Sequence, residues 1–140
     1  MATASRKQNP GVFLVTLATH KLRPVFAISR VAELFIETLL ALRQAGLFKL
    51  HAFLVLPDRV HLLLSPQAMP LARAVELTEA AFAERLDSVQ LVWDPAFQSH
   101  PIHSIRDLET LRTHIHELPV RAKLTAAAEL YPYSSASRMR

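Results

Sequence analysis

Two runs of alternating apolar residues, separated only by a turn-like pair, constrain the fold of this chain more than any other feature. Apolar residues alternate with other residues along Phe48–Leu56, and the alternation resumes in residues 60–64 after Pro57-Asp58. A period of two is typical of a β-strand, and proline followed by aspartate favours a turn. The two runs therefore predict a β-hairpin.

Three helices and three further strands are predicted around this hairpin. Val12–Ala18 is a continuous apolar run, which is typical of a strand buried on both faces. Ser29 is a candidate cap for a helix that Gly46 would end, and its inward positions are Val31, Leu34, Phe35, Leu39 and Leu42. Pro70 would open a second helix, with Leu71, Ala74, Val75, Thr78, Phe82 and Leu86 on one face.

The last third of the chain predicts two short strands and the third helix. The strand candidates are residues 91–93 and 101–103. The helix would start near Asp107 and end before or at Pro119, because proline lacks the N–H that continues a helix. Its inward residues would be Leu108, Leu111, Ile115 and Leu118.

The resulting order, β-α-β-β-α-β followed by a helix, predicts an α+β fold of the ferredoxin-like, split βαβ type. We expect an antiparallel sheet with helices packed on one face. A chain of 140 residues with 51% hydrophobic content suits one domain, residues 1–140. The polar termini, residues 1–10 and 134–140, are expected to be mobile.

Charge and composition narrow the class of protein only slightly. The net charge of +4 and a pI near 10 favour a polyanionic partner. The absence of cysteine excludes disulfides and thiolate metal sites. Apolar runs fall short of the roughly 20 residues of a membrane span, and residues 1–10 lack the apolar core of a signal peptide. We therefore expect a cytoplasmic protein that has no membrane partner.

The predicted hairpin resembles the metal-binding strand of the HUH single-tyrosine transposases, which include REP-associated tyrosine transposases and insertion-sequence transposases. Residues 51–64 read HAFLVLPDRVHLLL, and the family's run ends in Pro-Asn-His-Val-His. Four more segments resemble the family in the same order. Residues 12–27 contain LRPVF beside "RRPLF", residues 92–111 follow the spacing of "VWQRGFYDRVIRDEEDL", THIHELPVRAKL resembles "RYIHLNPVRAGL", and YPYSSA resembles "YPWSSA".

The resemblance implies an activity whose residues this chain has largely replaced. Family members cut single-stranded DNA by attack of a tyrosine hydroxyl, assisted by magnesium or manganese. Two strand histidines and a helix asparagine bind the metal. By that correspondence, the first histidine is Arg59 here, the second is kept as His61, the tyrosine is His114 and the asparagine is Leu118. The resemblance is thus to a degenerate member.

The replacements predict that nicking has been lost. Arginine has no lone pair for a metal ion and its charge repels one, so we expect no bound cofactor at the vestigial metal site of Arg59, His61 and Leu118. Arg59 should pair with a carboxylate, Asp58 or Glu117, or face solvent. Whether the chain is an enzyme stays open, since His114 could replace the tyrosine as nucleophile or base. His61 with His114 or His116 could also form a remodelled metal site, although His114 is more simply a tolerated replacement.

The family's partner is DNA, single-stranded or hairpin, and some members are homodimers. The candidate DNA-binding residues are Lys21, Arg23, Arg121 and Lys123, whose alternative role is a solvated surface. Helix 70–87 argues against DNA, because Glu79 and its neighbours stand where the family is basic. Four aromatic residues could stack on bases or pack in the core: Trp93, Phe97, Tyr131 and Tyr133. The sequence therefore predicts an inactive, transposase-like DNA-binding protein, or else a domesticated or decaying scaffold.

Overall fold

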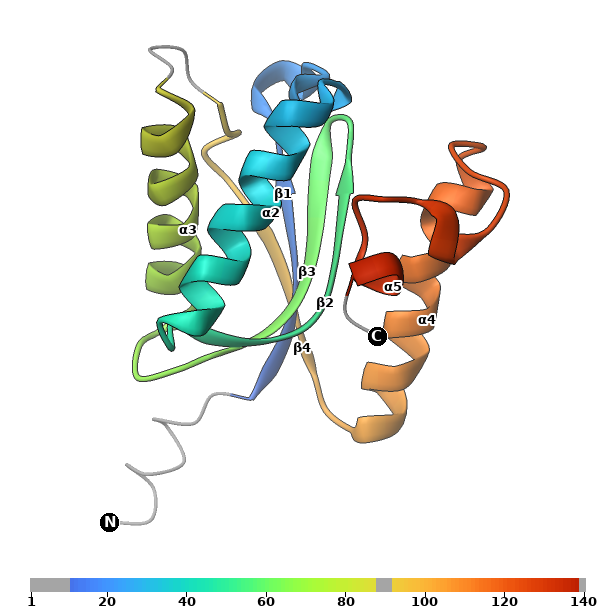
Figure 1. Cartoon of the computed structure of the whole chain (residues 1–140). Coiled ribbons are helices and arrows are strands. Elements are labelled where there is room, and N and C mark those ends of the chain that lie inside the picture. The colour runs from blue at the N-terminus through green and yellow to red at the C-terminus, as the bar shows by residue number, and fades with distance from the viewer. Residues whose placement is uncertain (1–10, 88–91, 139–140) are drawn as a thin grey trace.

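The computed structural model describes residues 11–87 and 92–138. Its centre is an antiparallel sheet in the order β2-β3-β1-β4. The strands are β1 (Val12–Ala18), β2 (Phe48–Leu56), β3 (Arg59–Pro66) and β4 (Gln98–Ile102). This is the predicted ferredoxin-like arrangement, and β2 and β3 form the predicted hairpin through Pro57-Asp58 (Figure 1).

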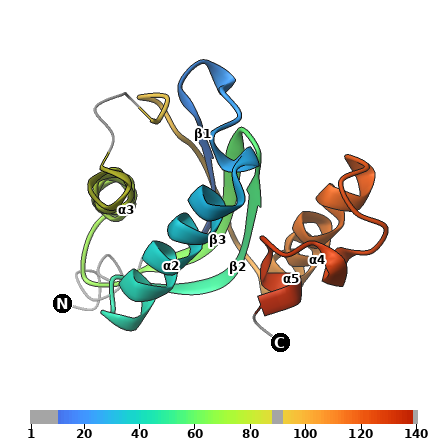
Figure 2. The same ribbon diagram turned by 45° about the horizontal axis from the view of Figure 1, so that its top comes forward.

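Helices lie on both faces of the sheet. Helices α2 (Ser29–Gln44) and α3 (Leu71–Leu86) cover one face, as predicted for the βαββαβ unit (Figures 1 and 2). The additional helix α4 (Ile105–Arg121) and the short α5 (Ser135–Arg138) lie on the opposite face. Three 3₁₀ turns complete the described structure: η1 (His20–Leu22), η2 (Val25–Ala27) and η3 (Ala128–Leu130).

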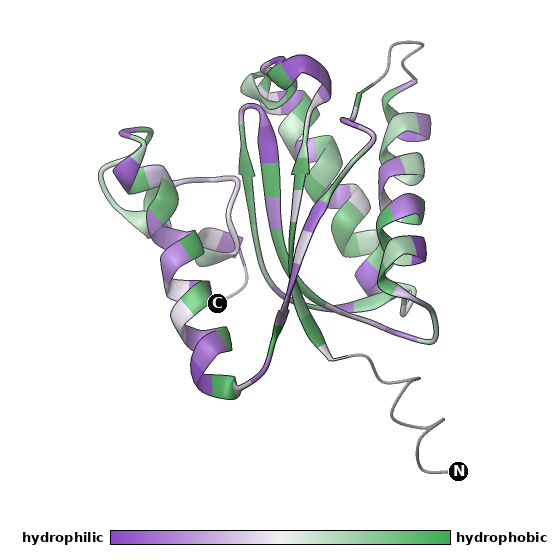
Figure 3. Ribbon diagram, turned by 180° about the vertical axis from the view of Figure 1, so that it is seen from behind, coloured by the Kyte–Doolittle hydropathy of each residue, from purple (hydrophilic) through white to green (hydrophobic). Residues whose placement is uncertain are grey.

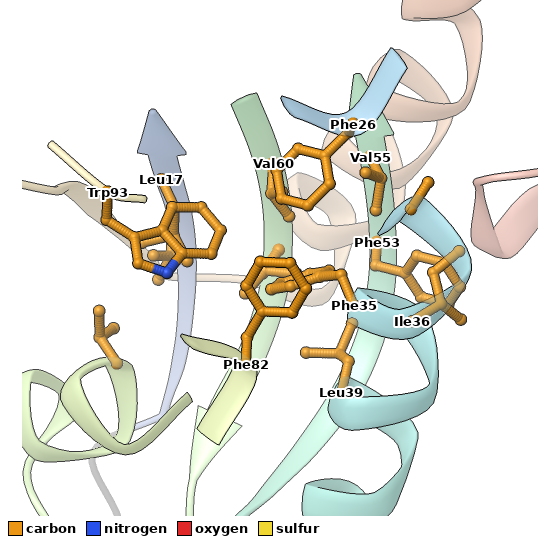
Figure 4. Packing of buried hydrophobic residues seen from close by; sticks show 14 of the residues in the cluster. Leu17, Phe26, Phe35, Ile36, Leu39, Phe53, Val55, Val60, Phe82 and Trp93 are labelled. Atoms are coloured by element: carbon orange, nitrogen blue, oxygen red, sulfur yellow. The ribbon is translucent and has the colours of Figure 1, made fainter. Parts of the chain in front are cut away.

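Four aromatic side chains fill the centre of the larger core, between the sheet and helices α2 and α3. Phe26, Phe35, Phe82 and Trp93 contact one another with ring centroids 5.2 to 5.8 Å apart (Figure 4). Trp93 is only 6% exposed, and Phe97 packs against the same cluster. Both aromatic residues therefore serve as core rather than as open platforms for bases.

A smaller core lies between the sheet and α4. Its buried members are Ala52, Leu54, Leu63, Ile115 and Tyr131. Leu108, Leu111 and Leu118 pack against them, which confirms the predicted inward face of this helix. Hydrophobic residues dominate β1, β2 and β3, whereas the edge strand β4 is largely hydrophilic (Figure 3).

Three elements have boundaries that differ from the prediction. Ile28, not Ser29, is the N-cap of α2, and no side chain caps it. Helix α4 starts at Ile105 after the cap Ser104, and it continues through Pro119 to Arg121. Proline lies in the last turn, where it removes one hydrogen bond, while its buried ring keeps the apolar face of the helix intact. Strand β4 spans residues 98–102 rather than 101–103.

The other strand candidate, residues 91–93, is not a strand in its described part. Leu91 lies outside the described residues, and Trp93 forms a single bridge with Thr19. The structure contains no helix that is both long and apolar enough to cross a membrane, within residues 11–87 and 92–138.

The C-terminal segment is helical from Ser135 to Arg138 and packs against the sheet, whereas residues 1–10 and 139–140 of the termini predicted to be mobile lie outside the described residues. The segment covers the free edge of β2. The Val55 N–H donates to the Tyr133 carbonyl (2.9 Å), and the Phe53 N–H donates to Ser135 Oγ (3.0 Å). Arg138 reaches Glu33 on α2 at 2.6 Å. These non-local partners order a polar sequence.

Candidate functional site

Strand β3 turns Arg59 and His61 towards the face covered by α4. Side chains alternate along a strand, so residues 59, 61 and 63 point to the same face of the sheet, and Leu63 lies in the core beneath α4. The opposite end of the site comes from α4 itself, where Leu118 packs into that core and His114 is close enough for its charge to influence His61. The four positions that correspond to the family's catalytic residues thus lie on one side of the sheet, as predicted.

Arg59 is held by its neighbour in the turn. Its Nε lies 3.1 Å from Asp58 Oδ1, and its Nη2 lies 3.4 Å from Asp58 Oδ2. This confirms the predicted carboxylate partner and selects Asp58 over Glu117. Because both side chains are partly exposed, the pair adds at most about 1 kcal/mol to stability. Its main effect is to offset the guanidinium charge beside His61.

These residues do not fit a divalent metal ion. Arg59 and Leu118 have no lone pair to offer, and in residues 11–87 and 92–138 no group of three or more His, Cys, Asp or Glu side chains could hold a metal. His116 is engaged elsewhere, since its Nε2 lies 2.7 Å from Ser135 Oγ. This hydrogen bond competes with any role of His116 in a remodelled site, whereas the pair of His61 with His114 stays a prediction.

His61 is a neutral, hydrogen-bonded residue. Its Nδ1 lies 3.1 Å from Oγ1 of Thr16, its partner in the β1–β3 register. Burial lowers the pKa of His61 to about 4, and the charges of Arg59 and His114 act in the same direction against a smaller opposing effect of Asp58. The sequence did not indicate Thr16, because the register between β1 and β3 is fixed only in the folded sheet.

Acid should destabilise the protein partly through His61. The pKa of this histidine is near 4 when folded and 6.5 when unfolded, so the unfolded chain binds the proton more readily between these values. The contribution of His61 to the free energy of unfolding is then constant above pH 6.5. It falls by roughly 1–3 kcal/mol as the pH drops towards 4. Urea unfolding of His61→Gln should show a shallower loss from pH 6.5 to 4. An unchanged slope would contradict this assignment. The control is His103→Gln, which replaces an exposed histidine that does not act on His61.

The basic candidates gather at one end of the molecule. Lys21 and Arg23 lie in the loop after β1, and Arg121 and Lys123 lie where α4 ends. Both segments lie at the same end as the β2–β3 turn, which carries Arg59 (Figure 1). Lys21, Arg121 and Lys123 are exposed, and Arg23 is partly buried with its Nε donating to the His20 carbonyl at 3.3 Å.

Lys123 occupies a backbone position that favours glycine. Its φ is 61°, and it follows the C-cap of α4. The Leu124 N–H donates to the Pro119 carbonyl (2.9 Å) and the Lys123 N–H to the Val120 carbonyl (3.0 Å), the two bonds of a Schellman motif. The family pattern "NPVRAGL" has glycine at this place. A lysine here therefore adds a positive charge at the expense of backbone strain.

Replacing Lys123 with glycine should stabilise the fold. Relief of the left-handed strain should outweigh the added freedom of the unfolded chain, which gives a net gain of about 0.5–1 kcal/mol. The midpoint of urea unfolding measures this change. The matched control is Arg121→Gly, which removes the same charge inside the helix and should destabilise by about 1 kcal/mol. A Lys123→Gly midpoint at or below that of the unmodified protein would refute the strain argument.

The acidic helix α3 lies on the face of the sheet opposite α4 (Figure 2), and Arg59 and His61 are turned towards the α4 face. Its charge is also partly offset. Glu76 pairs with Arg73 at 2.5 Å, and burial, with the help of Glu76, raises the pKa of Glu79 to about 7. The acidic residues of α3, which the sequence suggested would weaken DNA binding, therefore lie away from the site. Their negative charge is also smaller than the number of acids implies.

The remaining polar candidates have structural partners. The Tyr131 hydroxyl donates to the Val55 carbonyl (2.7 Å), and its pKa is raised to about 12 by burial and by Tyr133. The two tyrosine rings pack edge to face, with centroids 5.7 Å apart. Nε2 of His51 lies 2.9 Å from Ser65 Oγ. Neither Tyr131 nor His51 is thus placed to react with a substrate.

Comparison with known proteins rests on structure alone. No protein-family model matches the sequence, and no curated protein sequence matches it. A REP-associated tyrosine transposase bound to a REP hairpin superposes with a TM-score of 0.79, at 17% identity over 93% of this chain and 79% of that chain. A putative transposase from Deinococcus radiodurans R1 superposes with a TM-score of 0.58, at 21% identity over 76% of this chain and 88% of that chain. This chain therefore has the fold of the tyrosine transposases.

Proposed function

We propose that this protein binds single-stranded or hairpin DNA without cutting it. The observation that carries the proposal is the placement of two basic segments at one end of a fold shared with a hairpin-bound transposase (Figure 1). The first contains Lys21 and Arg23, and the second contains Arg121 at the end of α4 and Lys123 after it. Cations spaced along a surface bind phosphates and release counterions. Such a protein would act in the cytoplasm, where DNA is accessible to it, as a monomer or a homodimer.

The loss of cutting follows from the side chains at the site. His114 offers an imidazole where a phenol hydroxyl would attack, and Leu118 offers only a hydrocarbon. Among the residues that the structure describes, no group of three or more His, Cys, Asp or Glu side chains could hold a metal ion to polarise a phosphate. Arg59 can still face a phosphate, because its pair with Asp58 is partly exposed and can exchange partners. The site is thus suited to holding a phosphodiester and unsuited to breaking it.

A scaffold without a nucleic-acid role is the second candidate. It is favoured by the Asp58 carboxylate, which offsets Arg59, and by the acids of α3. This candidate predicts no preference of the protein for DNA and no role for the basic segments.

The salt dependence of hairpin binding separates the two candidates. We expect the affinity to fall steeply with salt, and each of two double variants, Lys21→Ala with Arg23→Ala and Arg121→Ala with Lys123→Ala, to reduce the slope of log K against log salt by about 1.5. The measurement is a gel-shift titration at several salt concentrations.

A matched control is available at the other end of the molecule. Arg43 and Lys49 are exposed at the end of α2 and the start of β2, so their double alanine variant changes the net charge equally. It should leave the slope unchanged. Binding too weak to detect at low salt, or equal slopes for all three variants, would favour the scaffold.

A further inference from the structure

Each of the two basic segments presents an exposed leucine beside a lysine. Leu22, between Lys21 and Arg23, is 52% exposed, and Leu124, beside Lys123, is 46% exposed. We call residues 21–23 the first tip and residues 123–124 the second tip. Five large hydrophobic residues are exposed in the described structure, and the other three lie outside these tips: Ile28, Ile105 and Leu130. An isolated exposed leucine is ordinary, but two of them set among cations at the same end form a distinct surface.

The first tip is fixed at both ends. The Thr19 N–H donates to the Asp58 carbonyl (3.0 Å), and the Phe26 N–H donates to the Pro57 carbonyl (3.0 Å). Thr19 Oγ1 also donates to the Arg23 carbonyl (2.8 Å). The loop is therefore tied to the β2–β3 turn, and its exposed part is held rather than free.

Within that frame, two consecutive residues adopt the left-handed conformation. The φ of Lys21 is 56° and that of Leu22 is 53°. A leucine avoids this conformation unless surrounding contacts impose it. Since Leu22 remains half exposed, the strain does not serve to bury it. The fold thus holds an apolar side chain in solvent, between two cations.

The second tip also exposes a leucine beside a left-handed lysine, but a helix C-terminus fixes its conformation. The Schellman motif after α4 sets Lys123 in the left-handed conformation and directs Leu124 out of the helix. Thr125 Oγ1 donates to the Ala127 carbonyl (3.1 Å), which closes the following turn. The two tips lie at the same end, with the β2–β3 turn between them (Figure 1).

Within the two segments themselves, the charged residues are all of one sign. Residues 19–28 and 121–127 contain no aspartate or glutamate. The nearest acid in the turn between them, Asp58, is paired with Arg59. A partner for this surface must offer anionic groups next to flat or apolar ones. Unpaired nucleotides do so, because each phosphate is followed by a base with an apolar face.

We propose that Leu22 and Leu124 contact unpaired bases of a DNA hairpin or single strand, while the flanking cations bind the adjacent phosphates. This inference rests on the proposed DNA binding and specifies its mode. Aliphatic side chains are known to contact base steps as apolar wedges. A fully paired blunt duplex offers no exposed base face along its length, so the two leucines would favour unpaired DNA.

The test compares Leu22→Ser, Leu124→Ser and the control Ile105→Ser, which changes an 80% exposed residue at the start of α4. The DNA probes are a hairpin with an unpaired 2-aminopurine extension and a blunt duplex of equal charge. Leu22→Ser should weaken hairpin binding roughly three- to tenfold and reduce the 2-aminopurine response, with an unchanged salt slope. Leu124→Ser should act in the same direction. Ile105→Ser should leave hairpin binding unchanged, and none of the three variants should change binding to the duplex.

Several outcomes would overturn the inference without affecting DNA binding itself. Hairpin binding equal to that of the unmodified protein in both leucine variants is one, and an equal loss for hairpin and duplex is another. Loss of binding to vesicles of anionic lipid, with hairpin binding intact, would assign the surface to membranes instead. Far-UV circular dichroism melts confirm that the variants fold. If the unmodified protein binds no DNA, that result refutes the proposed function itself, and it is distinguishable from a result that refutes only the role of the two leucines.

Discussion

The unmodified protein is expected to form no covalent adduct with single-stranded hairpin DNA and no cleavage product, with magnesium or manganese present. Histidine at 114 removes the phenol hydroxyl that would attack the phosphate, and Arg59 and Leu118 remove two of the three metal-binding positions that the family resemblance implies. A denaturing gel with end-labelled hairpin DNA measures both products. An adduct formed by the unmodified chain would sink this assignment.

Restoring the site should recover activity only when the residues are replaced together. We expect Arg59→His, His114→Tyr and Leu118→Asn in one protein to form a detectable adduct, and each single change to form none, because nucleophile and metal act as a unit. The four positions already share one side of the sheet, with His61 in place. Adding His61→Ala to the triple variant should abolish the adduct again.

The structure also predicts the penalty of this restoration. Leu118 packs against the small core beneath α4, so asparagine there should destabilise the fold by roughly 2–4 kcal/mol. The assay therefore needs a thermal melt of each variant beside it. Adducts from any single variant would contradict the view that the residues act as a unit. A folded, DNA-binding triple variant without an adduct would show that the site geometry, and not only its chemistry, has changed.

Ending the chain after Leu130 should remove most of its stability. The deletion uncovers the edge of β2, where Val55 and Phe53 lose their partners, and removes the buried Tyr131 from the core under α4. The expected loss is several kcal/mol, comparable with the roughly 5–15 kcal/mol that stabilises an ordinary domain. Urea unfolding and size-exclusion chromatography should show a poorly folded, self-associating protein, because an open strand edge pairs with other chains.

Two point variants divide this loss between its parts. Tyr131→Phe removes only the hydrogen bond to the Val55 carbonyl and should cost about 1 kcal/mol. Arg138→Ala removes the exposed pair with Glu33 and should cost under about 1 kcal/mol. A truncated chain that unfolds at the same urea concentration as the full chain would mean that the C-terminal segment does not protect β2.

Local sequence determined the elements, because hydrophobic periodicity and turn chemistry act over a few residues. The alternation around Pro57-Asp58 was enough to predict the β2–β3 hairpin, and helical spacing was enough to predict α2, α3 and the inward face of α4. The order of those elements then predicted the ferredoxin-like sheet. The motif resemblance identified Arg59, His61, His114 and Leu118 as one site, and the two-residue spacing put the first two on one strand face.

Only the tertiary structure decided the features that depend on partners far away in the chain. Ser135 and Tyr133 are ordered because the edge of β2, some 80 residues earlier, supplies hydrogen bonds that a polar tail would otherwise find in water. His61 stays neutral because burial and the charges of Arg59 and His114 act on it together. The left-handed Lys21 and Leu22 are imposed by bonds from Thr19 and Phe26 to the β2–β3 turn. Local preferences cannot predict such conformations, because their energy comes from long-range contacts that exist only once the sheet has formed.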